Sequence, residues 1–302
     1  MKNQTIGVEV EFTGLTRSEA AQIIADYFGT SYRITSRSPY YKHEIRDNEG
    51  RIWTVMRDCS VNEFRKLGRN NVIPAPYTRN EEYKCELVTP ILRYKDIETL
   101  QEIIRLIRKG GMYTDNSCGI HVHIGAKDMS AKQICNLVKT VNAHDDLIYK
   151  ALNIAEYREE KYCHKTNQRF LKDIETHKPT TIAELEHLWY NGSSRAHVHY
   201  DLSRYQGLNL HSLFSKGTVE FTLFDSVTHA GKIKAYIQFC LAIVAKARTD
   251  KRCSSKPIVT DNHKYTFRCW LLKLGLNGDE FKTCRLHMMA KLEGNGSYRH
   301  GA

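Results

Sequence analysis

The residues best placed to do chemistry in this 302-residue sequence begin with Glu9 and Glu11, in the segment TIGVEVEFT at 5–13. Its alternation of apolar and acidic residues predicts a β-strand, and residues two apart on a strand point to the same face. Adjacent carboxylates raise each other's pKa unless a cation neutralises them. A hard divalent ion such as Mg²⁺ takes oxygen ligands. The pair therefore predicts a metal site, with two solvated glutamates on an exposed strand as the alternative.

A pair of histidines has the same spacing. His121 and His123 lie in GIHVHIG at 119–125, which also reads as a strand, and glycines bracket the pair. Two imidazoles on one strand face can ligate a metal ion or contact a phosphate. A single histidine here would more often be a structural group, so the pairing is what favours a functional site.

Three further carboxylates lie in or just after predicted strands. They are Asp58 after 51–57, Glu86 within 83–89 and Glu220 within 217–224. If these strands are neighbours, their acidic and imidazole side chains share one polar floor. That floor would hold more negative charge than is tolerated without two or more cations.

A candidate anion-binding group precedes the last of these strands. Arg204, Asn209 and His211 lie in RYQGLNLH, just before the Glu220 strand. A planar guanidinium near carboxylates suits a transferring phosphoryl group or a substrate carboxylate. A surface ion pair is the alternative for Arg204.

Longer amphipathic segments must support this floor. Helices are expected at 17–28 (after a capping box at Thr16 and Glu19), 97–111, 131–152, 232–248, 261–276 and 279–292. Strands separated by such helices predict an α+β fold, with helices packed on one face of a sheet and the active site on the other. The chain is expected to be a single domain over 1–302, with insertions near 36–83 and 157–194 and a helical C-terminal segment at 261–292.

Composition limits the partners. The net charge is +11, which favours an anionic partner; nucleic acid stays open but is not favoured. No apolar run approaches the roughly 20 residues of a membrane span, and the polar N-terminus does not resemble a signal peptide. Nine scattered cysteines are expected to be reduced thiols, which suits a cytoplasmic protein. Oligomeric state is not readable from the sequence.

Six segments together resemble the putative amidoligase family of the carboxylate–amine ligase superfamily, related to glutamate–cysteine ligase and glutamine synthetase. They occur in the family's order and span most of the chain: IGVEVEFTG from Ile6, the tryptophan strand with aspartate from Trp53 to Ser60, CELVTPIL from Cys85, SCGIHVHIG from Ser117, RYQGLNLHSLF from Arg204, and GTVEFTLFDSVTHAGKIKAYIQ from Gly217. The ordered set, rather than any one segment, carries the resemblance.

The resemblance implies a glutamine-synthetase-like fold, in which a curved, mainly antiparallel sheet holds a nucleotide and two or three Mg²⁺ ions in its hollow. It implies that Glu9 and Glu11 bind different metal ions. The residues that would complete the metal shells are Asp58, Glu86, His123 and Glu220. His121, Asn209 and Arg195 are expected beside the nucleotide, and His121 is also a candidate metal ligand.

One position departs from the family pattern. The family tends to carry arginine two residues after the glutamate of its VEF strand, and this sequence has Thr222 there. Arg204 or Arg195 would then have to stabilise the phosphate. The hypothesis is an ATP- and Mg²⁺-dependent ligase that forms an amide or peptide bond through an acyl phosphate. Arg204, Asp58 and Glu220 are its expected catalytic residues.

The substrates of such a ligase, a carboxylate and an amine on a small molecule, peptide or protein tail, are not readable from the sequence. Two other functions remain open. Paired carboxylates with histidines also suit a metal-dependent phosphoesterase or nuclease, which would need no ATP. Thr222 leaves open a non-catalytic nucleic-acid- or anion-binding protein on a decayed ligase fold.

Overall fold

The computed structural model describes residues 1–36, 38–68 and 70–298 and shows a mixed fold of helices and a mostly antiparallel sheet. Eight strands follow the order β2-β3-β4-β7-β1-β8-β10-β9, and β5 and β6 form a separate pair. The chain divides into two compact units. The N-terminal unit comprises 5–122 and 224–234, and the C-terminal unit comprises 1–4, 123–223 and 235–302.

Antiparallel strands form the sheet structure of the N-terminal unit. They are β1 (Ile6–Phe12), β2 (Tyr32–Ile34), β3 (His43–Arg46), β4 (Ile52–Met56), β5 (Phe64–Lys66), β6 (Val72–Pro74) and β7 (Cys85–Val88). β7 pairs with β1 on one side and with β4 on the other, and β3 joins β4 to β2. The expected strands at 5–13, 51–57 and 83–89 correspond to β1, β4 and β7.

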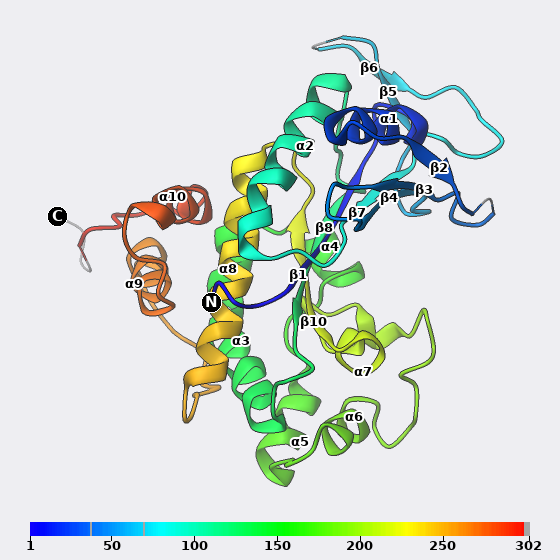
Figure 1. Ribbon diagram of the computed structural model, residues 1–302. Helices are drawn as coiled ribbons and strands as arrows, with labels where there is room; N and C mark the ends of the chain where they lie inside the picture. The colour runs from blue at the N-terminus through cyan, green and yellow to red at the C-terminus, as the bar shows by residue number, and fades with distance from the viewer. Residues whose placement is uncertain (37, 69, 299–302) are drawn as a thin grey trace. The chain divides into compact units, whose positions relative to one another are not determined.

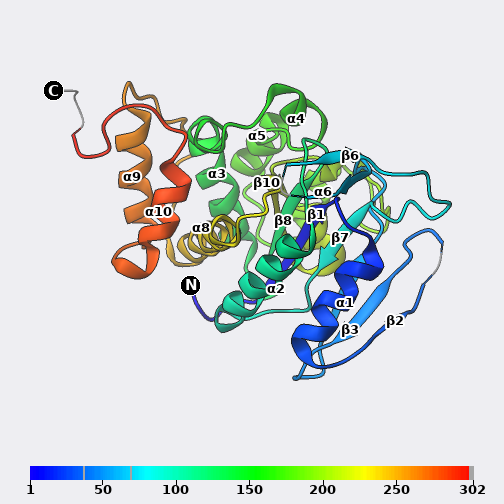
Figure 2. The same ribbon diagram turned by 90° about the horizontal axis from the view of Figure 1, so that it is seen from above.

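Two helices cover this part of the sheet. α1 (Arg17–Phe28) begins with the predicted capping box, in which Thr16 and Glu19 each bond the other's backbone N–H. α2 (Ile97–Gly110) follows the short 3₁₀ helix η1 (Tyr94–Asp96). α1 and α2 lie side by side in both views (Figures 1 and 2).

The helices and the carboxylates lie on opposite faces of the N-terminal sheet. Met56, Glu86 and Glu11 oppose one another across three strands, so their side chains point to one face. Trp53 is three residues from Met56 and therefore faces the other way. Its ring contacts Phe28 of α1, with centroids 5.7 Å apart. The predicted arrangement, with helices behind the sheet and carboxylates on the other face, is confirmed within this unit.

The C-terminal unit is mainly helical. Its elements are α3 (Ala131–Leu152), α4 (Glu156–Lys161), α5 (Gln168–His177), α6 (Ile182–Trp189), η2 (Leu202–Arg204), β9 (Leu208–Asn209), α7 (His211–Lys216), α9 (His263–Lys273), η3 (Asp279–Phe281) and α10 (Lys282–Met289). Three elements contribute residues to both units: β8 (Gly119–Gly125), β10 (Thr218–Asp225) and α8 (Ala230–Thr249).

The last two helices are part of the core of the C-terminal unit. α9 and α10 lie side by side (Figures 1 and 2). Phe267 and Trp270 of α9 both contact Phe239 of α8, with ring centroids 6.1 and 5.6 Å apart. Cys284 and Met288 of α10 are fully buried. A helical C-terminal segment was expected, and these contacts show why it packs.

Several expected helix boundaries need correction. α2 begins at Ile97 as expected, with Asp96 at its N-cap position, but the Asp96 side chain makes no capping bond to α2: its carboxylate accepts the backbone N–H of Arg93 and pairs with Arg51, 3.0 Å away. Asn262, rather than Asp261, caps α9, because its side chain accepts the backbone N–H of Tyr265. The segment expected as one helix over 279–292 is η3 followed by α10, which ends at Met289.

The two expected insertions have regular structure. Segment 36–83 holds β3 and β4, which are strands of the main sheet, as well as β5 and β6. Arg37 and Arg69 of this segment lie outside the described residues. Segment 157–194 holds most of α4 and all of α5 and α6.

The nine cysteines are thiols that take no part in disulfide bonds. Among the residues that the structure describes, none of the helices combines the length and the apolar character needed to cross a membrane.

Candidate active site

Three carboxylates converge on the polar face of the N-terminal sheet. Glu11 on β1 and Glu86 on β7 are directly opposed, and Asp58 follows the end of β4. One oxygen from each of the three lies within 4.8 Å of the others. Glu11 and Glu86 are each 6% exposed, so solvent screens their mutual repulsion poorly. The sequence placed these residues on separate strands, and strand pairing brings them together.

Burial raises the pKa of Glu86 well above its ordinary value, and the negative charges of Glu9, Asp58 and Glu11 raise it further. His121 opposes this effect weakly. Among the described residues, no lysine or arginine lies within ion-pair distance of Glu86 or Asp58. The protein therefore concentrates negative charge here without supplying a cation of its own, which is the donor chemistry that a hard divalent ion requires.

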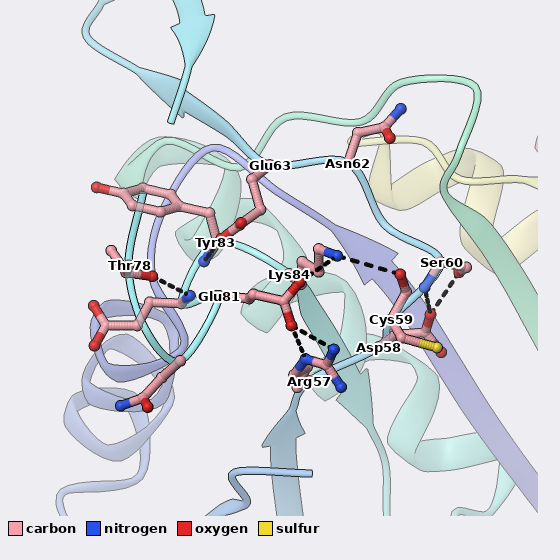
Figure 3. Close-up of polar contacts among 12 residues, drawn as sticks. Arg57, Asp58, Cys59, Ser60, Asn62, Glu63, Thr78, Glu81, Tyr83 and Lys84 are labelled. Carbon is pink, nitrogen blue, oxygen red and sulfur yellow. Dashed lines mark hydrogen bonds and ion pairs between the residues drawn. The ribbon is translucent and has the colours of Figure 1, made fainter. Parts of the chain in front are cut away.

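The backbone and neighbouring side chains orient these carboxylates. Asp58 accepts hydrogen bonds from the backbone N–H of Ser60 at 2.7 Å and from the Ser60 hydroxyl at 2.5 Å (Figure 3). Glu11 accepts the backbone N–H of Gly119 at 2.5 Å, and its own carbonyl accepts the hydroxyl of Ser226 at 2.6 Å. Asp58 and Glu11 are thus each held through one oxygen, as expected of a preorganised ligand.

His121 lies near both Glu9 and Glu11. Glu9 Oε2 is 3.3 Å from His121 Nδ1, and Glu11 Oε1 is 3.8 Å from His121 Nε2. Glu11 therefore lies near His121 as well as in the cluster with Asp58 and Glu86, whereas Glu9 lies beside His121.

An ion-pair network that the sequence reasoning missed lies beside the carboxylates. Arg57 and Lys84 both pair with Glu81, and Lys84 Nζ is 2.6 Å from Glu81 Oε1 (Figure 3). Lys84 also donates to the carbonyl of Cys59, at 3.4 Å. A signal was present in the sequence, since Arg57 directly precedes Asp58 and Lys84 lies two residues before Glu86. Nothing local indicated that Glu81 would join them.

The C-terminal unit holds the other predicted residues. Glu220 on β10 is 4% exposed and opposes Asn209 on β9, whose side-chain amide donates to Glu220 Oε2 at 2.7 Å. His123 Nε2 is 3.8 Å from Glu220 Oε1, while its Nδ1 is 3.1 Å from the Thr218 hydroxyl. His123, Asn209 and Glu220 therefore form one buried polar group.

A pocket of about 300 Å³ opens beside this group in the C-terminal unit. Its lining includes Glu220, Asn209, Arg204, Lys216, His197 and His199. Among the described residues, neither Arg204 nor Lys216 has a carboxylate partner. Arg204 instead lies over the rings of Tyr200 and Tyr205, 5.8 and 5.9 Å from their centroids. The two cations outnumber the one carboxylate of the lining, Glu220, and this balance of charge suits an anion.

Two other residues singled out in the sequence, Arg195 and Thr222, do not line this pocket. Arg195 forms an ion pair with Asp201, at 2.5 Å, and does not line the pocket. Thr222 is buried, and its hydroxyl donates to the carbonyl of Gln206 at 2.8 Å. Of the two arginines considered as substitutes for the residue missing at 222, Arg204 is the one that lines the pocket beside Glu220.

Comparison with known proteins identifies a family to which this sequence is similar. A family model described as a putative amidoligase enzyme matches residues 2–244, about four-fifths of the chain. A search of curated proteins found no match. The matched range includes β1, β4, β7, β8 and β10, and with them every predicted site residue.

Proposed function

This chain belongs to the family of putative amidoligase enzymes, and from that premise we propose that it is an ATP- and Mg²⁺-dependent ligase that joins a carboxylate to an amine. The observation that carries the proposal is the Glu11–Asp58–Glu86 cluster, whose oxygens lie within 4.8 Å of one another and have no lysine or arginine at Asp58 or Glu86. The proposal includes a glutamine-synthetase-like curvature of the sheet and a cytoplasmic location.

The donor set fits Mg²⁺, because three carboxylates offer hard oxygen ligands and their mutual repulsion requires a cation. Glu11, Asp58 and Glu86 would hold one ion. Glu9, His121, His123 and Glu220 are the further candidates for metal binding. When bound, such ions supply charge neutralisation at the phosphates of ATP.

The reaction needs two steps, because a free carboxylate has no adequate leaving group. A carboxylate oxygen first attacks the γ-phosphorus of ATP, the bond to the bridging oxygen breaks, and ADP leaves. The amine then attacks the carbonyl carbon of the acyl phosphate. The bond from that carbon to the phosphate oxygen breaks, inorganic phosphate leaves and the amine nitrogen loses a proton.

Residues of the chain take three roles in the proposal. Arg204 binds the anionic acyl phosphate in the pocket beside Glu220, aided by the positive potential of Lys216. Asn209 holds the Glu220 carboxylate in position through its 2.7 Å hydrogen bond. Asp58, which is half-buried, orients the amine or accepts its proton.

Nucleotide binding tests the proposal without knowledge of the substrates. A non-hydrolysable ATP analogue should raise the melting temperature of the wild-type protein, and Mg²⁺ should enlarge the shift. Glu86→Gln removes a buried charge without changing side-chain size, so it should retain the fold and lose the Mg²⁺-dependent part of the shift. ADP release with mixed amines and carboxylates should fall by about a hundredfold or more in this variant.

Other outcomes would contradict the proposal. ADP release that persists unchanged in Glu86→Gln would remove the cluster from the mechanism. Hydrolysis of a phosphoester with no ATP and no amine would identify a metal-dependent phosphoesterase. Salt-sensitive binding of nucleic acid with no response to nucleotide would identify a binding protein on a decayed ligase fold.

A further inference from the structure

The backbone ladder between β4 and β7 ends just where the metal-binding carboxylates begin. Its last opposed pair is Met56 and Glu86. Beyond it, Arg57 bonds through its backbone N–H to the carbonyl of Tyr40 instead of to β7. The ends of the two strands are joined by side chains, because Glu81 accepts from Arg57 Nε at 2.6 Å and pairs with Lys84 at 2.6 Å (Figure 3).

The backbone of the turn that carries Glu81 is held by a buried arginine from α1. The guanidinium of Arg17, a residue that is 2% exposed, donates to the carbonyls of Asn80, Glu81 and Lys84 at 2.7, 2.5 and 3.1 Å. Glu81 itself has φ +47°, a backbone conformation that non-glycine residues rarely adopt. The turn before β7 is therefore anchored in a strained conformation that directs Glu81 toward Arg57 and Lys84.

This arrangement determines where two cations go. Arg57 is the immediate neighbour of Asp58 along the chain, and Lys84 is two residues from Glu86. Without Glu81, each cation would gain from pairing with the nearby acidic cluster and would compete there with a divalent ion. With Glu81, both cations are paired, and neither Asp58 nor Glu86 has a basic partner among the described residues.

We propose that Glu81 is a positioning residue of the metal site: it holds Arg57 and Lys84 away from Asp58 and Glu86, and so leaves those carboxylates for the divalent ion. This rests on the proposed function, which places an ion at the Glu11–Asp58–Glu86 cluster. It adds a residue outside that cluster and a reason for the local charge pattern.

Binding of Mn²⁺ to the full chain tests this, with free Mn²⁺ measured by electron paramagnetic resonance. Glu81→Gln should weaken Mn²⁺ binding by about tenfold or more, the usual effect of losing a group that supports metal ligands. Glu49→Gln is the matched control. Glu49 also lies between two cations, Arg51 and Lys95, at 3.4 and 3.3 Å, but at the other end of β4. Its variant should bind Mn²⁺ as the wild type does.

A double variant shows whether weaker Mn²⁺ binding comes from the released cations or from a folding defect. Arg57→Gln combined with Glu81→Gln removes one of the two released cations and leaves Lys84, so Mn²⁺ should bind at least about threefold more tightly than it does to Glu81→Gln alone. A double variant that binds as weakly as Glu81→Gln alone would overturn the inference, as would wild-type affinity in Glu81→Gln. Circular dichroism reports whether each variant is folded, and the double variant decides the question if Glu81→Gln alone does not fold. Absence of Mn²⁺ binding by the wild type would instead refute the proposed function.

Discussion

Two neighbouring residues of α3, His144 and Asp145, titrate abnormally in opposite directions. Burial raises the pKa of Asp145 to about 6, although the carboxylate accepts the backbone N–H of Thr166 at 3.0 Å. Burial also lowers the pKa of His144 to about 4, and its ring stacks on Trp270 with centroids 3.8 Å apart. Both shifts come from loss of water around the charged form.

The two shifts have opposite effects on stability. The folded protein binds the Asp145 proton more tightly than the unfolded chain does, so this residue lowers stability as pH rises from about 4 to 6. The unfolded chain binds the His144 proton more tightly, so this residue lowers stability as pH falls from about 6.5 to 4. The two residues therefore change the free energy of unfolding in opposite directions over this window.

Asp145→Asn should therefore have a pH-dependent effect. The amide oxygen can still accept the N–H of Thr166, and no buried charge remains. We expect the free energy of unfolding at pH 7 to rise by about 1–3 kcal/mol. Between pH 6.5 and 4 the variant should lose stability through His144 alone. Urea denaturation at several pH values measures both effects, and parallel curves for variant and wild type would contradict the prediction.

At the scale of elements, two glycines, one after β1 and one after α1, are required for different reasons. Both have a left-handed backbone, but only the first lacks room for a side chain. Gly14 has φ +97°, and a Cβ there would lie 2.3 Å from the carbonyl oxygen of Gly111. Its backbone also bonds the β5 strand, through the carbonyl of Phe64 and the N–H of Lys66. Gly29 caps α1 with φ +65°, and a Cβ there would meet nothing within 4 Å.

Gly14→Ala should consequently cost far more than Gly29→Ala. Gly29→Ala should lower the free energy of unfolding by about 1 kcal/mol, because only the left-handed backbone disfavours alanine there. Gly14→Ala adds a collision with the backbone of Gly111 and Tyr113, so we expect the free energy of unfolding to fall by about 3 kcal/mol or more. Chemical denaturation of the two variants gives the comparison. Equal losses would show that the space around Gly14 yields easily.

Elements differ in how much of their structure is local. α1 begins and ends at the predicted residues, since the capping box at Thr16 and the glycine at 29 are encoded within a few positions. The short strands β2, β3, β5, β6 and β9 were not predicted. Each has two to four residues, too few to show a period, and exists because of a partner elsewhere in the chain.

At the scale of the whole molecule, the family match ends at residue 244, yet the core continues beyond it. Phe267 is fully buried, and its ring contacts Phe239 and Trp270. Phe267→Ala should lower the free energy of unfolding by about 3–5 kcal/mol, the usual cost of removing a buried phenyl ring. Leu286→Ala, at a residue of α10 that is 65% exposed, should cost less than about 1 kcal/mol. A small effect of Phe267→Ala in urea denaturation would show that α9 is peripheral.

The sequence by itself determined which side chains are available on each strand, since alternation is a local property: Glu9 and Glu11 share a face whatever β1 pairs with. Only the tertiary structure decided which carboxylates meet. Opposition of Glu11 and Glu86 depends on the register between β1 and β7, which no local pattern encodes. The capture of Arg57 and Lys84 by Glu81 likewise depends on a turn anchored from α1 by Arg17. Charged side chains interact through space, so the pairing of distant segments decides which charges become partners.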